Sequence, residues 1–152
     1  MEFLSELHPK IVHFPIALFV LYFVFETAGV IFNKEYISKS SLLILIIGVA
    51  SAVLAVLTGN QAQIAAKILH AGNLEFIGLI EEHETFATAT LWFFSILLTG
   101  RIYFSVKKKF SGRIRYLFML LGFIGCILVY LSGVYGGNLV FDKGIGVHVQ
   151  SK

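Results

Sequence analysis

The stretch that decides the fold is an uninterrupted apolar run, residues 41–59, with the sequence SLLILIIGVASAVLAVLTG. A helix of about 20 residues crosses a hydrocarbon core of about 30 Å, because each residue adds about 1.5 Å. Only helices and closed barrels satisfy their backbone hydrogen bonds in lipid, and an unbroken apolar run lacks the alternation of a barrel strand. Residues 41–59 are therefore predicted to form a membrane-spanning helix.

Three further apolar runs of similar length lie at about residues 11–32, 85–106 and 115–136. The composition agrees, because 57% of the residues are hydrophobic and only 14% are charged, with a mean hydropathy of +0.85. A soluble domain has about 25% charged residues. The sequence predicts a single all-α domain, residues 1–152, that forms an integral membrane up-down-up-down four-helix bundle.

Charges in the connections predict how the bundle is oriented. One side holds eight basic residues against one acid, Glu35, and the other side holds four basic residues against seven acids. The eight basic residues are Lys34, Lys39, Arg101, Lys107, Lys108, Lys109, Arg113 and Arg115. The positive-inside rule places them in the cytoplasm, so that both termini are non-cytoplasmic. We expect a multi-pass protein of a bacterial inner (cytoplasmic) membrane that contacts lipid and no nucleic acid, since the pI near 9.0 comes from these clusters.

The longest connection, residues 60–84, lies on the non-cytoplasmic side. Its segment from Ala62 to Leu69 has the spacing of a short amphipathic helix on the membrane surface. The stretch from Leu74 is expected to be helical already and to run into the third span. No small-x-small cleavage site follows the first apolar run, which is therefore expected to stay as a structural helix.

All five histidines, His8, His13, His70, His83 and His148, fall on the predicted non-cytoplasmic side. His13 and His83 lie at the first turns of spans one and three, which are diagonal neighbours in such a bundle. Two imidazoles facing each other there could ligate one haem iron from both sides. Ala17 and Ala87, one turn below them, would leave room for a flat macrocycle.

Small residues form stripes at helical spacing on spans two and four. The members are Gly48, Ala52, Ala55 and Gly59 on span two, and Gly122, Cys126, Val129, Gly133 and Gly136 on span four. Such stripes are common where membrane helices pack directly against each other, without any cofactor. They also suit a porphyrin edge, with Gly59 and Gly133 as candidate contacts, and the residues alone leave both interpretations open.

The sequence also supports a structural prediction at three other positions. Pro15 in the segment from Leu7 to Pro15 is expected to mark a late start of the first helix. Glu26 is the one acid inside a span, which makes a proton relay one hypothesis. The favoured interpretation is that it reaches toward Lys34 or Lys39 at the membrane surface. Cys126 is expected to be a small core residue rather than a reactive thiol.

Several markers along the chain resemble those of the bacterial membrane proteins called domain of unknown function 2231. They are Leu7-His8-Pro9-x-x-Val12-His13-Phe14-Pro15-Ile16-Ala17-Leu18, Leu57-Thr58-Gly59, His83, Ser132-Gly133-x-x-Gly136-Gly137-x-Leu139-Val140 and Gly144-Ile145-Gly146-Val147. The resemblance implies a membrane b-type cytochrome in which His8, His13 and His83 match the family's histidines. The family often has a histidine where this chain has Lys143, and His148 is a candidate replacement.

The leading hypothesis is an electron-transfer protein rather than an enzyme, with haem b held by His13 and His83. Lys10, Lys67 or Lys143 would pair with the haem propionates, and a second haem could use His8 with His70 or His148. A redox protein or a quinone is the expected partner. One alternative is a copper- or zinc-binding or transport protein that uses the five histidines. The other is a cofactor-free anchor subunit of a respiratory complex, and homo-oligomers are also compatible with the sequence.

Overall fold

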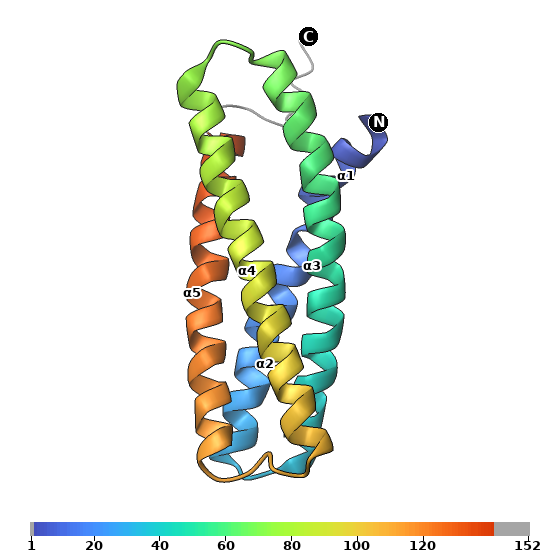
Figure 1. Cartoon of the computed structure of the whole chain (residues 1–152), viewed down its shortest axis with the longest axis vertical. Coiled ribbons are helices and arrows are strands. Elements are labelled where there is room, and N and C mark those ends of the chain that lie inside the picture. Colours follow the sequence, from blue (N-terminus) through green and yellow to red (C-terminus); the bar gives the residue numbers. More distant parts are fainter. Residues whose placement is uncertain (1, 142–152) are drawn as a thin grey trace.

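The structure is a computed structural model that describes residues 2–141, with side chains described from residue 7 onward (Figure 1). It contains five helices in the described range and no strand. The helices are α1 (Glu2–Ile11), α2 (His13–Ile31), α3 (Glu35–Leu69), α4 (Leu74–Val106) and α5 (Arg113–Phe141). The predictions on Lys143 and His148 lie outside the described residues.

Four segments of this range are long and apolar enough to cross a membrane: Leu7–Ile31, Glu35–Leu69, Leu74–Val106 and Arg113–Phe141. From α2 onward, consecutive helices run in opposite directions and pack against each other, and α5 closes back on α2 (Figure 1). The prediction of an all-α membrane bundle with four spanning helices is confirmed. The first and third spans lie diagonally across it, as expected.

The first span is broken near Val12, between α1 and α2. Pro15 has no N–H group, so the carbonyl of Ile11 cannot receive its usual helical hydrogen bond, and the proline ring crowds that carbonyl. The chain nevertheless stays helical on both sides of the break, and α1 leans against α3. The prediction of a late helix start was therefore wrong, because Pro15 breaks the helix locally instead of delaying its beginning.

The hairpin of α3 and α4 is much longer than the predicted spans. With 35 residues, α3 is about 52 Å long, well beyond the thickness of a hydrocarbon core. The segment from Ala62 to Leu69 continues α3, so the prediction of a separate surface helix was wrong. Its apolar spacing has a different cause, since Ala66 is buried against Phe76 and Ile80 of α4. The helix that begins at Leu74 was predicted.

Aromatic side chains fill the middle of the bundle. Phe19 of α2 stacks on Phe94 of α4, with ring centroids 3.7 Å apart and planes 3° apart. Gly125 of α5 makes room for this pair, because a Cβ atom at that position would overlap the ring of Phe94. Two members of the predicted stripes serve direct packing as well, because Gly48 lies against Phe19, and Gly122 lies against Phe23. This layer separates two ends of the bundle, which we call the histidine end, with His8 and His83, and the arginine end, with Arg101.

Candidate functional site

Two histidines from different helices face each other at the histidine end. The rings of His8 on α1 and His83 on α4 have centroids 6.4 Å apart and planes inclined at 68°. Both side chains are half-buried. They are 75 residues apart in the chain, so the break at Val12 and the diagonal placement of the two spans bring them together. This is the strongest grouping of chemically active side chains in the described part of the chain.

A hydrogen bond to α3 fixes the orientation of His8. Its Nδ1 atom lies 3.0 Å from the carbonyl oxygen of Ala55 and 3.2 Å from Oγ1 of Thr58. A carbonyl oxygen only accepts hydrogen bonds, so Nδ1 carries the proton and donates it. In the neutral ring the lone pair then resides on Nε2, which is the atom that a metal would bind.

His83 is held in the same way by α5. Its Nδ1 atom lies 3.1 Å from the carbonyl oxygen of Ser132 and therefore also donates. Within the part of the chain that the structure describes, no hydrogen bond reaches Nε2 of either ring. A carbonyl that fixes one nitrogen while the other stays available is the usual arrangement around a metal-binding histidine.

A glycine follows each accepting carbonyl by four residues, one helical turn further along. A Cβ atom on Gly59 would lie 2.8 Å from Cε1 of His8, and one on Gly136 would lie 3.0 Å from Cε1 of His83. Any larger residue would push the imidazole away from the helix and out of reach of the carbonyl. The two halves of the site thus share one local arrangement, a carbonyl that accepts from the histidine and a glycine four residues later. It occurs once on α3 and once on α5.

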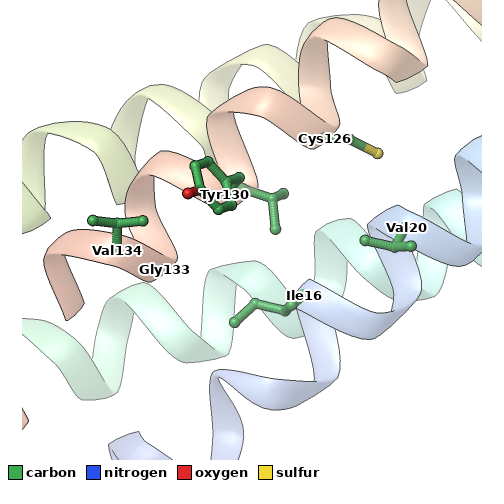
Figure 2. A pocket seen from close by; sticks show the side chains of 7 residues that line it. Ile16, Val20, Cys126, Tyr130, Gly133 and Val134 are labelled. Atoms are coloured by element: carbon green, nitrogen blue, oxygen red, sulfur yellow. The ribbon is translucent and has the colours of Figure 1, made fainter. Parts of the chain in front are cut away.

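A cavity of about 390 Å³ lies between α2 and α5 (Figure 2), and neither histidine is among the residues that line it. Its lining is mostly apolar and consists of Ile16, Val20, Cys126, Val129, Tyr130, Gly133 and Val134. Gly133 directly follows Ser132, which holds His83. A Cβ atom on Gly133 would meet nothing within 4 Å. The space between α2 and α5 is therefore open at Gly133.

The structure replaces one partner of the predicted facing pair. His13 is exposed and makes no ring contact with His83 within the described residues, whereas His8 does. The prediction assumed that the helix starts near His13, but the chain is helical before it, and α1 carries His8 against α3. Ala17 is exposed and Ala87 is half-buried.

His70 lies apart from this site. It follows the last residue of α3 and stacks on Phe76, with ring centroids 4.0 Å apart. Its Nδ1 atom is 3.2 Å from the carbonyl oxygen of Ala66. Eleven residues of helix separate it from Gly59, a distance of about 16 Å along α3. The structure gives it a packing role at the tip of the hairpin.

Sequence reasoning missed the residues that orient the two imidazoles. Ala55 was predicted only as a member of a small-residue stripe, and Thr58 and Ser132 were named only as markers of the family resemblance. The usable signal was the repeated four-residue spacing between an accepting carbonyl and a glycine, Ala55 to Gly59 and Ser132 to Gly136. That spacing becomes informative only once a histidine is known to lie against each helix.

The arginine end holds a second polar cluster, which is buried. Glu26 of α2 is fully buried, and Nε of Arg101 lies 3.4 Å from its Oε2 atom. Ser41 donates to the same oxygen at 2.5 Å. The guanidinium of Arg101 also donates to the carbonyl and hydroxyl oxygens of Ser38, both at 2.8 Å, and lies over the ring of Phe110. This cluster joins α2, α3, α4 and the loop before α5.

The expected position of Glu26 at the membrane surface was wrong. Its carboxylate turns inward to Arg101, and Lys39 pairs instead with Glu35 at 2.9 Å. Arg101 had been counted among the surface cations of the connection. A buried carboxylate needs a partner, and Arg101 lies 3% exposed at the facing position of α4.

Comparisons with known proteins give one match. No curated protein and no solved structure matches the chain. The family model described as "Predicted membrane protein (DUF2231)" matches residues 5–149, which is nearly the whole chain and includes both facing histidines. The chain belongs to this family of predicted membrane proteins.

Proposed function

We propose that this protein is a membrane b-type cytochrome that binds one haem b between His8 and His83. The observation that carries the proposal is the facing pair, in which a carbonyl orients each imidazole and no described residue bonds either Nε2 atom. His8 takes the role that the sequence had suggested for His13. The predicted orientation places this end of the bundle on the non-cytoplasmic side of the membrane.

The spacing of the two rings fits iron ligation from both sides. A bond between a metal and an imidazole nitrogen is about 2.0–2.1 Å long. Two imidazoles that bind one iron from opposite sides therefore have ring centroids about 6.3–6.5 Å apart. The observed separation is 6.4 Å. The same separation also lies within the range of edge-to-face ring packing, so the spacing agrees with ligation from both sides, and the haem assay described below distinguishes the two arrangements.

The chain around the pair supplies orientation and room. The carbonyl oxygens of Ala55 and Ser132 hold the two rings and increase the basicity of Nε2. The cavity beside Gly133 gives an apolar edge a place between α2 and α5. Lys10 is exposed two residues after His8 and is the proposed partner of a propionate. Lys67 is less suited, because it pairs with Glu81 at 3.3 Å.

When bound, haem b supplies an iron that takes up and releases one electron. Two histidine ligands leave no open coordination position for oxygen chemistry, so the proposed activity is electron transfer. A redox protein or a quinone is the proposed partner at the histidine end. A copper or zinc site fits less well, because such sites use three or four protein ligands. No three histidine, cysteine, aspartate or glutamate side chains cluster within the described residues.

Absorption spectroscopy tests this proposal. The protein is purified in detergent from haem-replete cells, and spectra are recorded before and after reduction with dithionite. A pyridine haemochrome assay counts the haem. We expect about one haem b per chain and the narrow, split visible bands of low-spin iron with two histidine ligands. A matched preparation of His83→Ala is expected to lose these bands, and a colourless wild-type protein would contradict the proposal.

A further inference from the structure

A second cavity, of about 400 Å³, lies at the arginine end, where α2 ends and α5 begins. It is lined by Val30, Ile31, Asn33, Gly112, Arg115 and Tyr116. It lies at the opposite end of the spans from the histidine pair, and the proposed electron transfer makes no use of it. Its lining combines an apolar wall with polar groups of one kind.

The polar side chains that line this cavity are the guanidinium of Arg115, the amide of Asn33 and the hydroxyl of Tyr116, all of which can donate hydrogen bonds. Arg115 donates from Nη1 to Oδ1 of Asn33 at 2.7 Å and from Nη2 to the carbonyl oxygen of Gly29. These bonds hold the guanidinium in place and leave some of its five N–H groups available. The hydrogen bond from Nη1 of Arg115 occupies Oδ1 of Asn33, so the amide NH₂ group of Asn33 is the group that can donate to a ligand. A fixed cation beside a free amide is suited to an anion.

No carboxylate lines the cavity within the described residues. Glu35, the nearest acid along the chain, pairs with Lys39 at 2.9 Å. Residues 107–115 contain five basic residues and no acid, so the surroundings are cationic as well. These basic residues are Lys107, Lys108, Lys109, Arg113 and Arg115. The local electrostatic field therefore favours a negatively charged ligand.

The apolar wall and the surrounding tyrosines place the cavity at the edge of the bilayer. Ile31 is 68% exposed, as expected for a side chain in contact with lipid. Tyr36, Tyr103 and Tyr116 are all exposed at this end of the bundle. Exposed tyrosines are typical of the level at which lipid headgroups lie. A ligand here can thus have a charged head at the cavity and an apolar tail along α2.

We infer that this cavity binds the phosphate headgroup of an anionic phospholipid. Arg115 and Asn33 donate hydrogen bonds to the phosphate oxygens, and Val30 and Ile31 contact the first part of an acyl chain. Basic pockets between membrane helices on the cytoplasmic side bind anionic headgroups in this way, and arginine offers the matching geometry for phosphate. The inference does not depend on the haem proposal.

The test uses the full-length protein, stripped of lipid in a neutral detergent and titrated with phosphatidylglycerol, phosphatidylcholine or inorganic phosphate. The thermal unfolding midpoint, followed by circular dichroism, reports binding. We expect a saturable rise with phosphatidylglycerol and no rise with the other two at equal concentrations. Equal protection by inorganic phosphate would overturn the assignment to lipid, and no rise with phosphatidylglycerol would overturn the site.

Two variants with opposite expectations locate the binding. Asn33→Asp keeps the left-handed backbone, where φ is 49°, and keeps an oxygen for Arg115, so the fold should survive. The substitution replaces the amide NH₂ group with a negative charge. We expect half-saturation to require at least roughly tenfold more phosphatidylglycerol. The control, Arg113→Gln, removes an exposed cation of the same loop and should change half-saturation less. The reverse order of the two effects would contradict the inferred site.

Discussion

The two ends of the bundle are built on the same helices but treat polar groups in opposite ways. At the histidine end, His8 and His83 are half-buried, and each donates one hydrogen bond from Nδ1 to a backbone carbonyl. At the other end, Glu26 and Arg101 are buried at 0% and 3% exposure and are surrounded by serine oxygens and an aromatic ring. The first arrangement leaves the Nε2 atoms of two half-buried rings without a partner among the described residues, whereas the second ties Oε2 of Glu26 and the guanidinium of Arg101 into internal bonds and encloses the unpaired Oε1 of Glu26.

Glycines of α5 show how this difference arises. Gly125 is covered by the ring of Phe94, so the missing side chain is replaced by direct packing. Gly133, about two turns further along, faces open space and lines the cavity. The same residue type therefore closes the bundle at one level and opens it at another. A small residue on a membrane helix therefore indicates direct packing or open space only when the side chain opposite it is known.

The largest expected effect is on the buried ion pair. Glu26→Ala leaves the guanidinium of Arg101 buried without its counter-ion, and we expect a loss of about 3–5 kcal/mol in the free energy of unfolding. Denaturant unfolding in detergent measures it, with Glu35→Ala, which breaks an exposed pair, as the control. Haem content per folded chain should be unchanged. A smaller loss of unfolding free energy in Glu26→Ala than in Glu35→Ala would contradict the described difference between the two ends.

A smaller effect is expected in the aromatic middle. Gly125→Ala places a methyl group against Phe94, and overpacking of this kind costs about 1–3 kcal/mol of stability. The matched control is Gly133→Ala in haem-free protein, where the methyl group enters open space and alanine favours the helix. Thermal unfolding compares the two. Equal destabilisation by both changes would contradict the contrast between filled and open levels of α5.

The next effect concerns the orientation of His8. Thr58→Val removes the hydroxyl that lies 3.2 Å from Nδ1, while the Ala55 carbonyl remains. Loss of such a supporting contact typically weakens metal-centre binding by about 10–100-fold, and we expect the lower value. Haem titration of the haem-free protein measures it. Thr90→Val is the control, because its hydroxyl bonds only the carbonyl of Phe86 in its own helix, and it should leave the affinity unchanged.

The smallest effect is expected at the tip of the long hairpin. Lys67→Gln breaks the ion pair with Glu81, whose side chain is 61% exposed. Exposed pairs contribute about 0–1 kcal/mol, and salt screens them. Thermal unfolding at low and high salt should show a small difference that shrinks as salt is added. A large, salt-independent loss would mean that this hairpin is far more important to stability than its exposure indicates.

Much of the fold was predictable because lipid imposes strong constraints on a spanning helix. Apolar runs such as residues 41–59 identified all four spans. The ends of the helices were not predictable, because water can satisfy the backbone hydrogen bonds beyond the membrane. Beyond the membrane, the length of α3 depends on tertiary packing, such as the packing of Ala66 against Phe76. No local sequence pattern reveals this packing.

The sequence led to the expectation that His13 and His83 face each other on diagonal spans, whereas the structure has a ring contact between His8 and His83. The sequence could not indicate His8, because its position depends on how a proline breaks a helix in three dimensions. Nor could it pair Glu26 with Arg101, since the two are 75 residues apart and only the packing of α2 against its neighbours brings them together.

The most direct test of the central claim compares three histidine variants purified side by side: His8→Ala, His13→Ala and His83→Ala. Haem per chain and the reduced absorption spectrum are measured for each. Ligation between His8 and His83 predicts that both of those variants lose the low-spin bands, while His13→Ala retains haem and spectrum like the wild type. Loss of haem in His13→Ala together with its retention in His8→Ala would contradict the claim.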